Sequence, residues 1–345
     1  MTLFRKGLVI LTILLFVGTC IIPAIAQDTE KSQTSRGNWL YVGGSGEGNY
    51  TTIQSAIDDA SDGDTVFVFD DSSPYCEEIE IEKSINLIGE NHNTVIDGMN
   101  EMETGITVHH DVDYVSINCF SIINFDGSGV DVYGDNVIIT NIYFINNFFG
   151  LSSIETKNIV ISNNLFQDCH RCGLCLYDTS NHLIDQNDIT GCEEGINFHV
   201  SSLDDTISNN EITNNIYGIN FEAFNEASRD KSIKNTIVQY NNITDNSIGI
   251  KIFGKFKNCV IKNNNFIENN ISVSYRIFLF QRLRINANFW GETKLLYKTI
   301  QGCSSIYLFT YAPGEHQGYQ IFLYLPKIIF DWHPAQEPYD IPGMT

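Results

Sequence analysis

The chain has 345 residues, with 42 Asp and Glu against 20 Lys and Arg, which gives a net charge of −22. A negative field of this size repels nucleic acid and anionic lipid, so neither is expected as a partner. It attracts cations, and it equally suits the solvated surface of an exported protein. Composition therefore excludes two classes of partner and assigns no activity.

The first 26 residues have the order of a secretory signal. Arg5 and Lys6 precede an apolar run over residues 7–23, which ends in the small-residue motif Ala24-Ile25-Ala26. We expect cleavage after Ala26, although the run is close to the lower length limit of a membrane anchor, which leaves anchoring open. No later apolar segment is long enough to span a membrane. The sequence thus predicts a secreted protein, extracellular or at the cell surface, with no membrane span once the signal is removed.

A fixed period runs through the middle of the chain. Asparagines recur every 23 residues, with one insertion of eight residues that we place near Ala223 to Lys231. An apolar residue stands three positions before almost every member, and another stands two positions after it. The asparagines are Asn118, Asn141, Asn164, Asn187, Asn210, Asn241, Asn264 and, one residue early, Asn286.

A glycine opens most repeats and is followed by alternating apolar and variable residues, as in Gly195-Ile196-Asn197-Phe198. This alternation predicts a short strand with one buried face. The apolar residues are mainly Ile, Val and Phe, which favours strands over a leucine-rich repeat. We predict an all-β fold, a single right-handed parallel β-helix of about ten coils of 22–23 residues. Stacked coils let inward asparagines bond to their neighbours above and below, and other Asn and Gly residues allow turns with positive φ.

The period also sets the expected domain limits. Residues 27–63 form an N-terminal segment whose capping helix lies within Thr52 to Ala60, with Ile53, Ala56, Ile57 and Ala60 on one side. The β-helix repeats cover residues 64–291. Residues 292–345 lose the period and gain five prolines, so we expect an irregular C-terminal cap.

Several segments together resemble the pectin-lyase-like β-helix superfamily, in particular exported archaeal and bacterial repeat proteins of the NosD type. The resemblance is specific for the fold, and it implies no single activity, because relatives include lyases, hydrolases, epimerases and copper-linked maturation proteins. The segments that carry it are Thr52-Ile53-Gln54, Gly63-Asp64-Thr65-Val66, Lys83-Ser84-Ile85-Asn86-Leu87-Ile88-Gly89-Glu90, Asn288-Phe289-Trp290-Gly291 and Phe330-Asp331-Trp332-His333-Pro334-Ala335.

Residues two and four positions after each repeat glycine should point outward on one face. Stacking would gather Tyr177, His199, Glu222 and Lys251 within four neighbouring coils. The candidate binding face comprises Asp131, Tyr133, Tyr177, Asn197, His199, Asn220, Glu222 and Lys251.

The leading hypothesis is a β-helix protein that binds polysaccharide or another cell-envelope component without catalysis. The alternative is a lyase or epimerase of uronate-containing glycans, which needs a base, an acid and a positive group. Tyr, His and Lys could fill these roles. No cofactor is expected, although Glu222 or Asp131 could hold Ca²⁺. The cluster contains no arginine and no paired aspartates, which favours the non-catalytic role and leaves catalytic residues unassigned.

Four cysteines, Cys169, Cys172, Cys175 and Cys192, are weak candidates for a metal site. Stacking would place Cys169 beneath Cys192, and a strand would direct Cys175 away, so a disulfide or free thiols is the preferred interpretation. A copper-linked accessory role is implied by the NosD-type resemblance alone. Met99, Met102, His109 and His110 form no Met-rich or His-rich tract that would support it.

Overall fold

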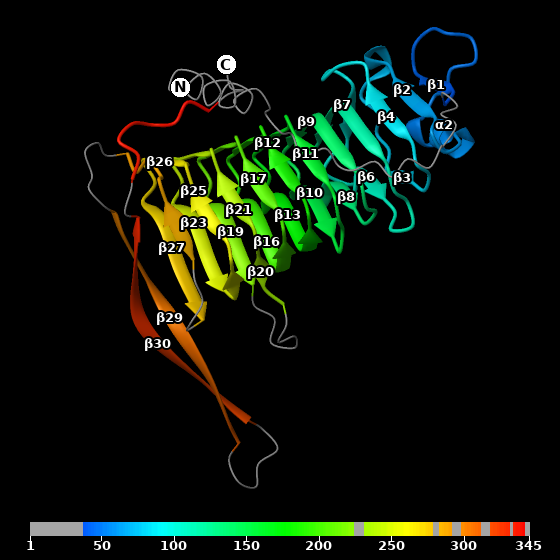
Figure 1. The fold of residues 1–345 in the computed structure, drawn as a ribbon. Coiled ribbons are helices and arrows are strands. Elements are labelled where there is room, and N and C mark those ends of the chain that lie inside the picture. The colour runs from blue at the N-terminus through cyan, green and yellow to red at the C-terminus, as the bar shows by residue number, and fades with distance from the viewer. Residues whose placement is uncertain are drawn as a thin grey trace, which may run out of the picture. The chain divides into compact units, whose positions relative to one another are not determined.

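The computed structural model describes residues 37–223, 231–278, 283–291, 298–311, 318–331 and 334–341. The expected signal, residues 1–26, and most of the insertion near Ala223 to Lys231 lie outside the described residues. Arg36–Thr345 forms one compact unit, in which parallel strands wind into a β-solenoid of about 10 turns (Figure 1). The predicted all-β parallel helix is confirmed.

Three faces make up the solenoid, two from a 17-stranded sheet and one from a 13-stranded sheet. The strands of the first face are β1 (Trp39–Val42), β2 (Thr65–Val68), β4 (Asn86–Gly89), β11 (Val160–Ser162), β14 (Leu183–Asp185), β17 (Thr206–Ser208), β21 (Ile237–Gln239), β25 (Val260–Lys262) and β28 (Arg284–Asn286). Those of the second are β5 (Val95–Asp97), β12 (Leu165–Gln167), β15 (Asp188–Thr190), β18 (Glu211–Thr213), β22 (Asn242–Thr244) and β26 (Asn265–Ile267). Two longer strands, β7 (Ser116–Ile123) and β9 (Ile138–Ile145), belong to both faces.

The third face carries the predicted outward residues. Its strands are β3 (Ile79–Ile81), β6 (Ile106–Val108), β8 (Ser128–Val132), β10 (Phe149–Ile154), β13 (Cys172–Ser180), β16 (Glu194–Leu203), β19 (Tyr217–Ala223), β23 (Ile248–Gly254) and β27 (Ile271–Phe278). Two short strands, β20 (Ile233–Lys234) and β24 (Phe256–Lys257), extend it beside the end of β16. Adjacent strands are parallel and in register, so each position along a strand becomes a column of stacked side chains.

The chain turns at the corners through residues with positive φ, among which asparagine is the commonest. Asn163 (φ 57°) and Asn209 (φ 54°) are examples. Asn and Asp visit this left-handed region more easily than other residues with a Cβ. The residue that follows at each of these two corners, Asn164 and Asn210, is buried. Asparagine pairs therefore serve two purposes, with the first member making the turn and the second pointing inward.

The inward asparagines form a continuous hydrogen-bonded ladder, as predicted. Each side-chain amide donates to the Oδ1 atom of the next coil, as between Asn187 and Asn210 (3.0 Å) and between Asn210 and Asn241 (2.9 Å). The ladder consists of Asn164, Asn187, Asn210, Asn241, Asn264 and Asn288.

Membership of this ladder differs from the sequence prediction at both ends. Asn118 and Asn141 are only partly buried, and Asn286 is exposed while Asn288 takes the inward position. The first coils repeat after 22 residues, since Ile117 pairs with Ile139 and Ile139 with Ile161. A 23-residue frame therefore misplaced Ile138, which is 44% exposed, because a one-residue slip turns a strand side chain to the opposite face.

The N-terminal end contains the predicted helix and a strand that the sequence did not indicate. Helix α2 (Ile53–Asp59) begins at Thr52, whose hydroxyl accepts a hydrogen bond from the Ser55 backbone N–H. Its buried side chains include Ile53, Ala56 and Ile57, as expected. Strand β1 extends the sheet by pairing with β2, and the 3₁₀ turn Asp70–Ser72 follows β2.

At the C-terminal end, the segment expected to be irregular contains a long antiparallel hairpin, β29 (Lys298–Tyr311) with β30 (Gly318–Asp331). Asp331 is buried and accepts hydrogen bonds from the Asn288 backbone N–H and from Trp290 Nε1. These bonds close the open end of the asparagine ladder. No helix in the described part of the chain is long and apolar enough to cross a membrane.

Candidate functional site

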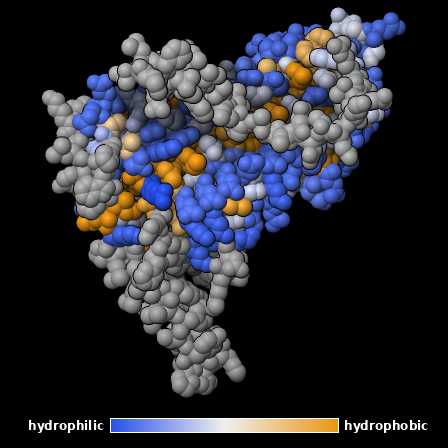
Figure 2. Space-filling model, in the orientation of Figure 1, coloured by the Kyte–Doolittle hydropathy of each residue, from blue (hydrophilic) through white to orange (hydrophobic). Residues whose placement is uncertain are grey.

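The third face brings the predicted outward residues together in register (Figure 1). One column runs Asp131, Ser152, Cys175, Asn197, Asn220, Lys251, and a second runs Ile154, Tyr177, His199, Glu222, Phe253. Hydrophilic residues cover most of the described surface that is visible in Figure 2. As the period predicted, four neighbouring strands carry Tyr177, His199, Glu222 and Lys251.

Asn197 and Asn220 lie on this face, yet both are completely buried. The Asn220 amide donates to Glu194 Oε1 at 2.8 Å, and the Asn197 amide donates to Glu194 Oε2. Neither Oδ1 atom has a hydrogen-bond partner, and these are the two buried side-chain atoms of the described residues for which that is true. Two amide oxygens in neighbouring coils therefore have no hydrogen-bond donor.

Glu194 is the residue of this site that the sequence analysis missed. It precedes the repeat glycine Gly195 and stacks in register between Cys172 and Tyr217, which forms a third outward column. Its carboxylate is 3.7 Å from the Arg171 guanidinium. The position just before each repeat glycine could have identified it. The sequence analysis considered only the positions two and four residues after each glycine.

Lys251 and Glu222 form an ion pair on this face. The Lys251 ammonium is 3.2 Å from Glu222 Oε1 and 4.4 Å from the centre of the Tyr217 ring. Burial favours the neutral form of Glu222, but the hydrogen bond from Asn220 and the Lys251 charge outweigh it and lower the pKa. Lys251, which follows Asn220 in the same column, is therefore already paired with a carboxylate.

His199 is held in one tautomer by its neighbours. Asn197 Nδ2 donates to its Nε2 atom at 2.8 Å, while Nδ1 faces Glu222 Oε2 at 3.6 Å. Burial is the main cause that lowers the pKa of His199. The ring is therefore neutral near pH 7 and stacks on Tyr177, with centroids 4.7 Å apart and planes 8° from parallel. Burial, followed by the neighbouring Cys175, raises the pKa of Tyr177 to about 12, so its phenol keeps its proton.

Asp131 lies in β8, and Tyr133 lies just beyond its end. Three strands separate β8 from β19, which carries Glu222. At about 4.8 Å per strand, Asp131 and Glu222 are about 19 Å apart. They cannot share a Ca²⁺ ion. Burial raises the pKa of Asp131, which weakens it further as a calcium ligand.

The four candidate cysteines fall into two pairs. Cys169 and Cys192 are buried in the core, next to each other and unbonded, rather than joined in a disulfide. Cys172 and Cys175 stand on the third face, where their thiols are hydrogen-bonded neighbours. The prediction that Cys175 points away from the other candidates is wrong for Cys172, because the chain bends between them and brings both to the outer face.

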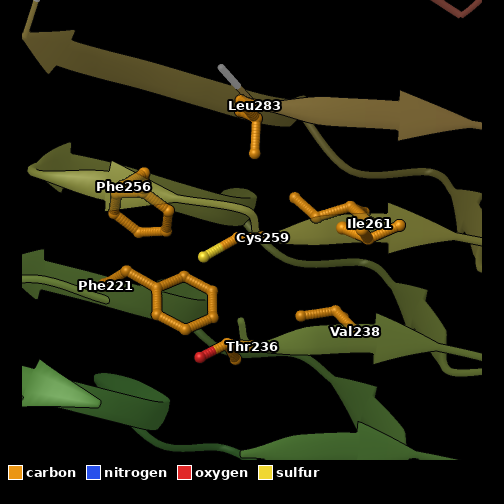
Figure 3. Close-up of a pocket in the computed structure, with 8 residues that line it drawn as sticks. Phe221, Thr236, Val238, Phe256, Cys259, Ile261 and Leu283 are labelled. Atoms are coloured by element: carbon orange, nitrogen blue, oxygen red, sulfur yellow. The ribbon is translucent and has the colours of Figure 1, made fainter. Parts of the chain in front are cut away.

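Figure 3 shows a small cavity inside the solenoid, with Phe221, Phe256 and Cys259 pointing into it. Its wall is apolar apart from Thr236 and the Cys259 thiol. Both of these groups already donate hydrogen bonds to backbone carbonyl oxygens. The cavity is a gap in the core packing and offers no groups for a sugar.

Solved structures confirm the fold. XylC in complex with xylose is 10% identical, with 76% of this chain and 71% of that chain covered at a TM-score of 0.52. A family 28 exopolygalacturonase of Yersinia enterocolitica is 12% identical, with 74% and 66% covered at 0.51. A GH136 lacto-N-biosidase of Eubacterium ramulus is 11% identical, with 73% and 60% covered at 0.51. At these identities the similarity concerns the fold alone.

No curated protein matches the sequence. Residues 57–306 match the family model described as periplasmic copper-binding protein (NosD). The match spans well over half of the chain and includes every strand of the third face from β3 to β27. The chain therefore belongs to the NosD family.

Proposed function

We propose that this protein is exported and binds polysaccharide on its third face, without catalysis. The observation that carries the proposal is the Tyr177–His199 ring stack beside the buried amide oxygens of Asn197 and Asn220. Sugar recognition combines a ring for the apolar face of the sugar with fixed polar groups for its hydroxyls. A chain lying along the solenoid axis meets a new coil about every 4.8 Å, so several coils contribute at once.

The state of the charged groups favours binding over chemistry. A uronate lyase needs a free positive group beside the substrate carboxylate. Lys251 is paired with Glu222, and Arg171 with Glu193 at 2.7 Å. A uronate would have to break an ion pair to be neutralised. A neutral sugar would not, and its hydroxyls would supply the donors that Asn197 and Asn220 lack once the side chains that cover these two residues move aside.

Two assays on the full-length chain test this proposal. A glycan array should reveal binding to polysaccharides or their fragments. Incubation with a panel of uronate polymers, with and without Ca²⁺, should leave the ultraviolet absorbance of unsaturated uronates unchanged, and NMR should show no epimerised residues. New absorbance or epimerisation would overturn the non-catalytic role, and an array without any binding would overturn the glycan partner.

The family description names copper. No group of three or more His, Cys, Asp or Glu among them could hold a metal ion. His109 is engaged with Glu80 at 2.5 Å, and Met99 lies exposed on the surface. The Cys172 and Cys175 thiols are soft ligands of the kind that selects Cu(I). The Cys175 thiol, burial and the Glu194 carboxylate together raise the pKa of Cys172, so the pair does not fit an ion that needs two thiolates.

A further inference from the structure

We propose that Asn270 is a site of N-linked glycosylation, modified once the chain is exported. The sequence contains three asparagines in the acceptor pattern Asn-x-Ser/Thr, namely Asn49, Asn242 and Asn270. The pattern alone does not rank them, because a sugar also needs an amide nitrogen that the fold leaves accessible. This site presupposes the proposed export and is independent of glycan binding by the third face.

Asn49 is folded into its own loop. Its Nδ2 atom donates to the Gly43 carbonyl oxygen at 2.6 Å, and its backbone N–H donates to Gly46 O at 3.3 Å. The loop runs so close to this side chain that a Cβ atom added at Gly46 would lie 2.7 Å from Asn49 Oδ1 and 2.9 Å from Nδ2. The loop therefore leaves no room for a sugar ring on Asn49 in the folded chain.

Asn242 is held between two neighbouring strands of the second face. Its Nδ2 atom donates to Glu211 Oε2 at 2.9 Å, and its Oδ1 atom accepts from Asn265 Nδ2 at 2.5 Å. Asn265 in turn bonds to the backbone N–H and the carbonyl oxygen of Tyr339. A sugar on Asn242 would therefore disturb both the contact with Glu211 and the contacts that join the C-terminal segment to the solenoid.

Asn270 is exposed, and the residue before it explains why. Asn269 takes the inward position at this corner, where its Oδ1 atom accepts from Asn246 Nδ2 at 3.0 Å and its Nδ2 atom donates to Ile243 O at 2.6 Å. The next side chain of an extended segment points to the opposite side. Asn270 therefore points to solvent, and its side chain forms no hydrogen bond within the described part of the chain. Its backbone N–H donates to Asn246 O at 3.1 Å, which fixes the acceptor at the corner.

The sugar donor is a lipid-linked oligosaccharide phosphate, which the exporting cell supplies. A bond forms between Asn270 Nδ2 and the anomeric carbon of the sugar, and the bond from that carbon to the phosphate oxygen breaks. The lipid phosphate leaves, and the proton that Nδ2 loses goes to solvent, so no oxidant or reductant is needed. The Ser272 hydroxyl, two residues further on, completes the acceptor pattern.

The sugar would lie at the C-terminal end of the third face, where β27 begins (Figure 1). Strands β19 and β23 separate β27 from β16, which carries His199. At about 4.8 Å per strand this separation is about 14 Å. The attachment point therefore lies beside the stack of Tyr177 and His199 and not over it. The sugar would instead shield Ile271, an apolar side chain that is 48% exposed.

The test is the intact mass of the full-length chain, secreted by a host that glycosylates its exported proteins. We expect one glycan per chain, located on Asn270 by peptide mapping of the unaltered protein. Asn270→Gln and Ser272→Ala should both lose the added mass, since the second change removes only the hydroxyl of the pattern. The matched controls Asn49→Gln and Asn242→Gln should keep it. A glycan that remains in the Asn270→Gln variant, or one mapped to Asn49 or Asn242, would overturn the assignment.

A second assay separates this site from export itself. The purified, folded full-length chain is incubated with membranes that contain an oligosaccharide transferase and its lipid-linked donor, with a short peptide of the same pattern as the positive control. A chain that the host retains, but that these membranes modify at Asn270, would contradict export alone. A chain that is secreted without sugar would overturn the Asn270 site and leave export standing. If the chain is retained and the membranes modify only the peptide, both fail.

Discussion

Asn210 and Asn220 are both completely buried, but Asn210 points inward at the corner between β17 and β18, whereas Asn220 lies on the outer side of the third face. Inside, Asn210 uses its whole amide. Its Oδ1 atom accepts from the Asn187 backbone and side chain at 2.9 and 3.0 Å, and its Nδ2 atom donates to Ile184 O and Asn241 Oδ1. On the outer face, Asn220 donates to Glu194 while its Oδ1 atom has no partner.

The difference separates an amide whose hydrogen bonds are all made within the fold from one whose oxygen has no partner there. An unsatisfied buried acceptor costs about 1–3 kcal/mol. The fold satisfies its inner asparagines coil after coil, and it leaves this cost unrelieved at two adjacent positions of one outer face. We infer that the inner column maintains the solenoid, whereas the outer pair is kept for recognition.

The largest effect is expected from a charge placed on the inner side. Ile184→Asp puts a carboxylate without a partner into the core and should reduce the free energy of unfolding by several kcal/mol. The neighbouring Leu183 is 38% exposed on the outside of the same strand, so Leu183→Asp should cost about 0.5 kcal/mol or less. Urea denaturation followed by circular dichroism compares the two variants. Equal midpoints would show that the inner and outer faces are assigned wrongly.

Removal of one ladder amide should have the next largest effect. Asn210→Ala leaves the Asn187 N–H and the Ile184 carbonyl oxygen without their partners in the core, and we expect a loss of about 3 kcal/mol. The same denaturation experiment measures it. A loss under about 1 kcal/mol would mean that the ladder contributes little to stability.

Lowering the pH tests the interior without a mutation. His182 is buried, with its Nδ1–H donating to Ser180 O at 2.9 Å and its Nε2 facing the Thr156 hydroxyl at 3.0 Å. Burial lowers the pKa of His182 below its usual 6.5. The unfolded chain therefore takes up a proton first, and stability should fall as the pH drops below about 6.5. Thermal melts from pH 7.5 to 5 should show this slope, and His182→Gln should reduce it. An unchanged slope in the variant would assign the effect to other groups.

Asn220→Ala should have the smallest effect of this series on stability. It removes the hydrogen bonds of its amide to Glu194 and Glu222 and, at the same time, an acceptor that has no partner, so the losses are partly offset. We expect a change of about 1 kcal/mol or less. A loss as large as that of Asn210→Ala would remove the distinction between the inner and the outer asparagines.

The sequence was informative wherever one coil repeats the next. The period predicted the solenoid and the stacking of Tyr177, His199 and Glu222, because register follows directly from repeat length. Helix α2 was predicted separately, from the helical spacing of its apolar residues. The period failed at Ile138 and Asn286, where the coil length changes by one or two residues and the frame is lost. The burial of Asn197 and the position of Glu194 depend on how long side chains fold over a face, which a period does not encode.

Two stacked His–Tyr pairs in the described part of the chain allow a direct test of the binding face. Tyr177 and His199 stack on the third face, while His92 and Tyr143 stack elsewhere on the surface, with centroids 3.8 Å apart. Calorimetric titration with a glycan that the array identifies should show at least tenfold weaker binding for Tyr177→Ala/His199→Ala, about 1.4 kcal/mol. The matched variant His92→Ala/Tyr143→Ala should bind as the wild type does. Unchanged affinity in the first variant, or an equal loss in both, would contradict a glycan site on the third face.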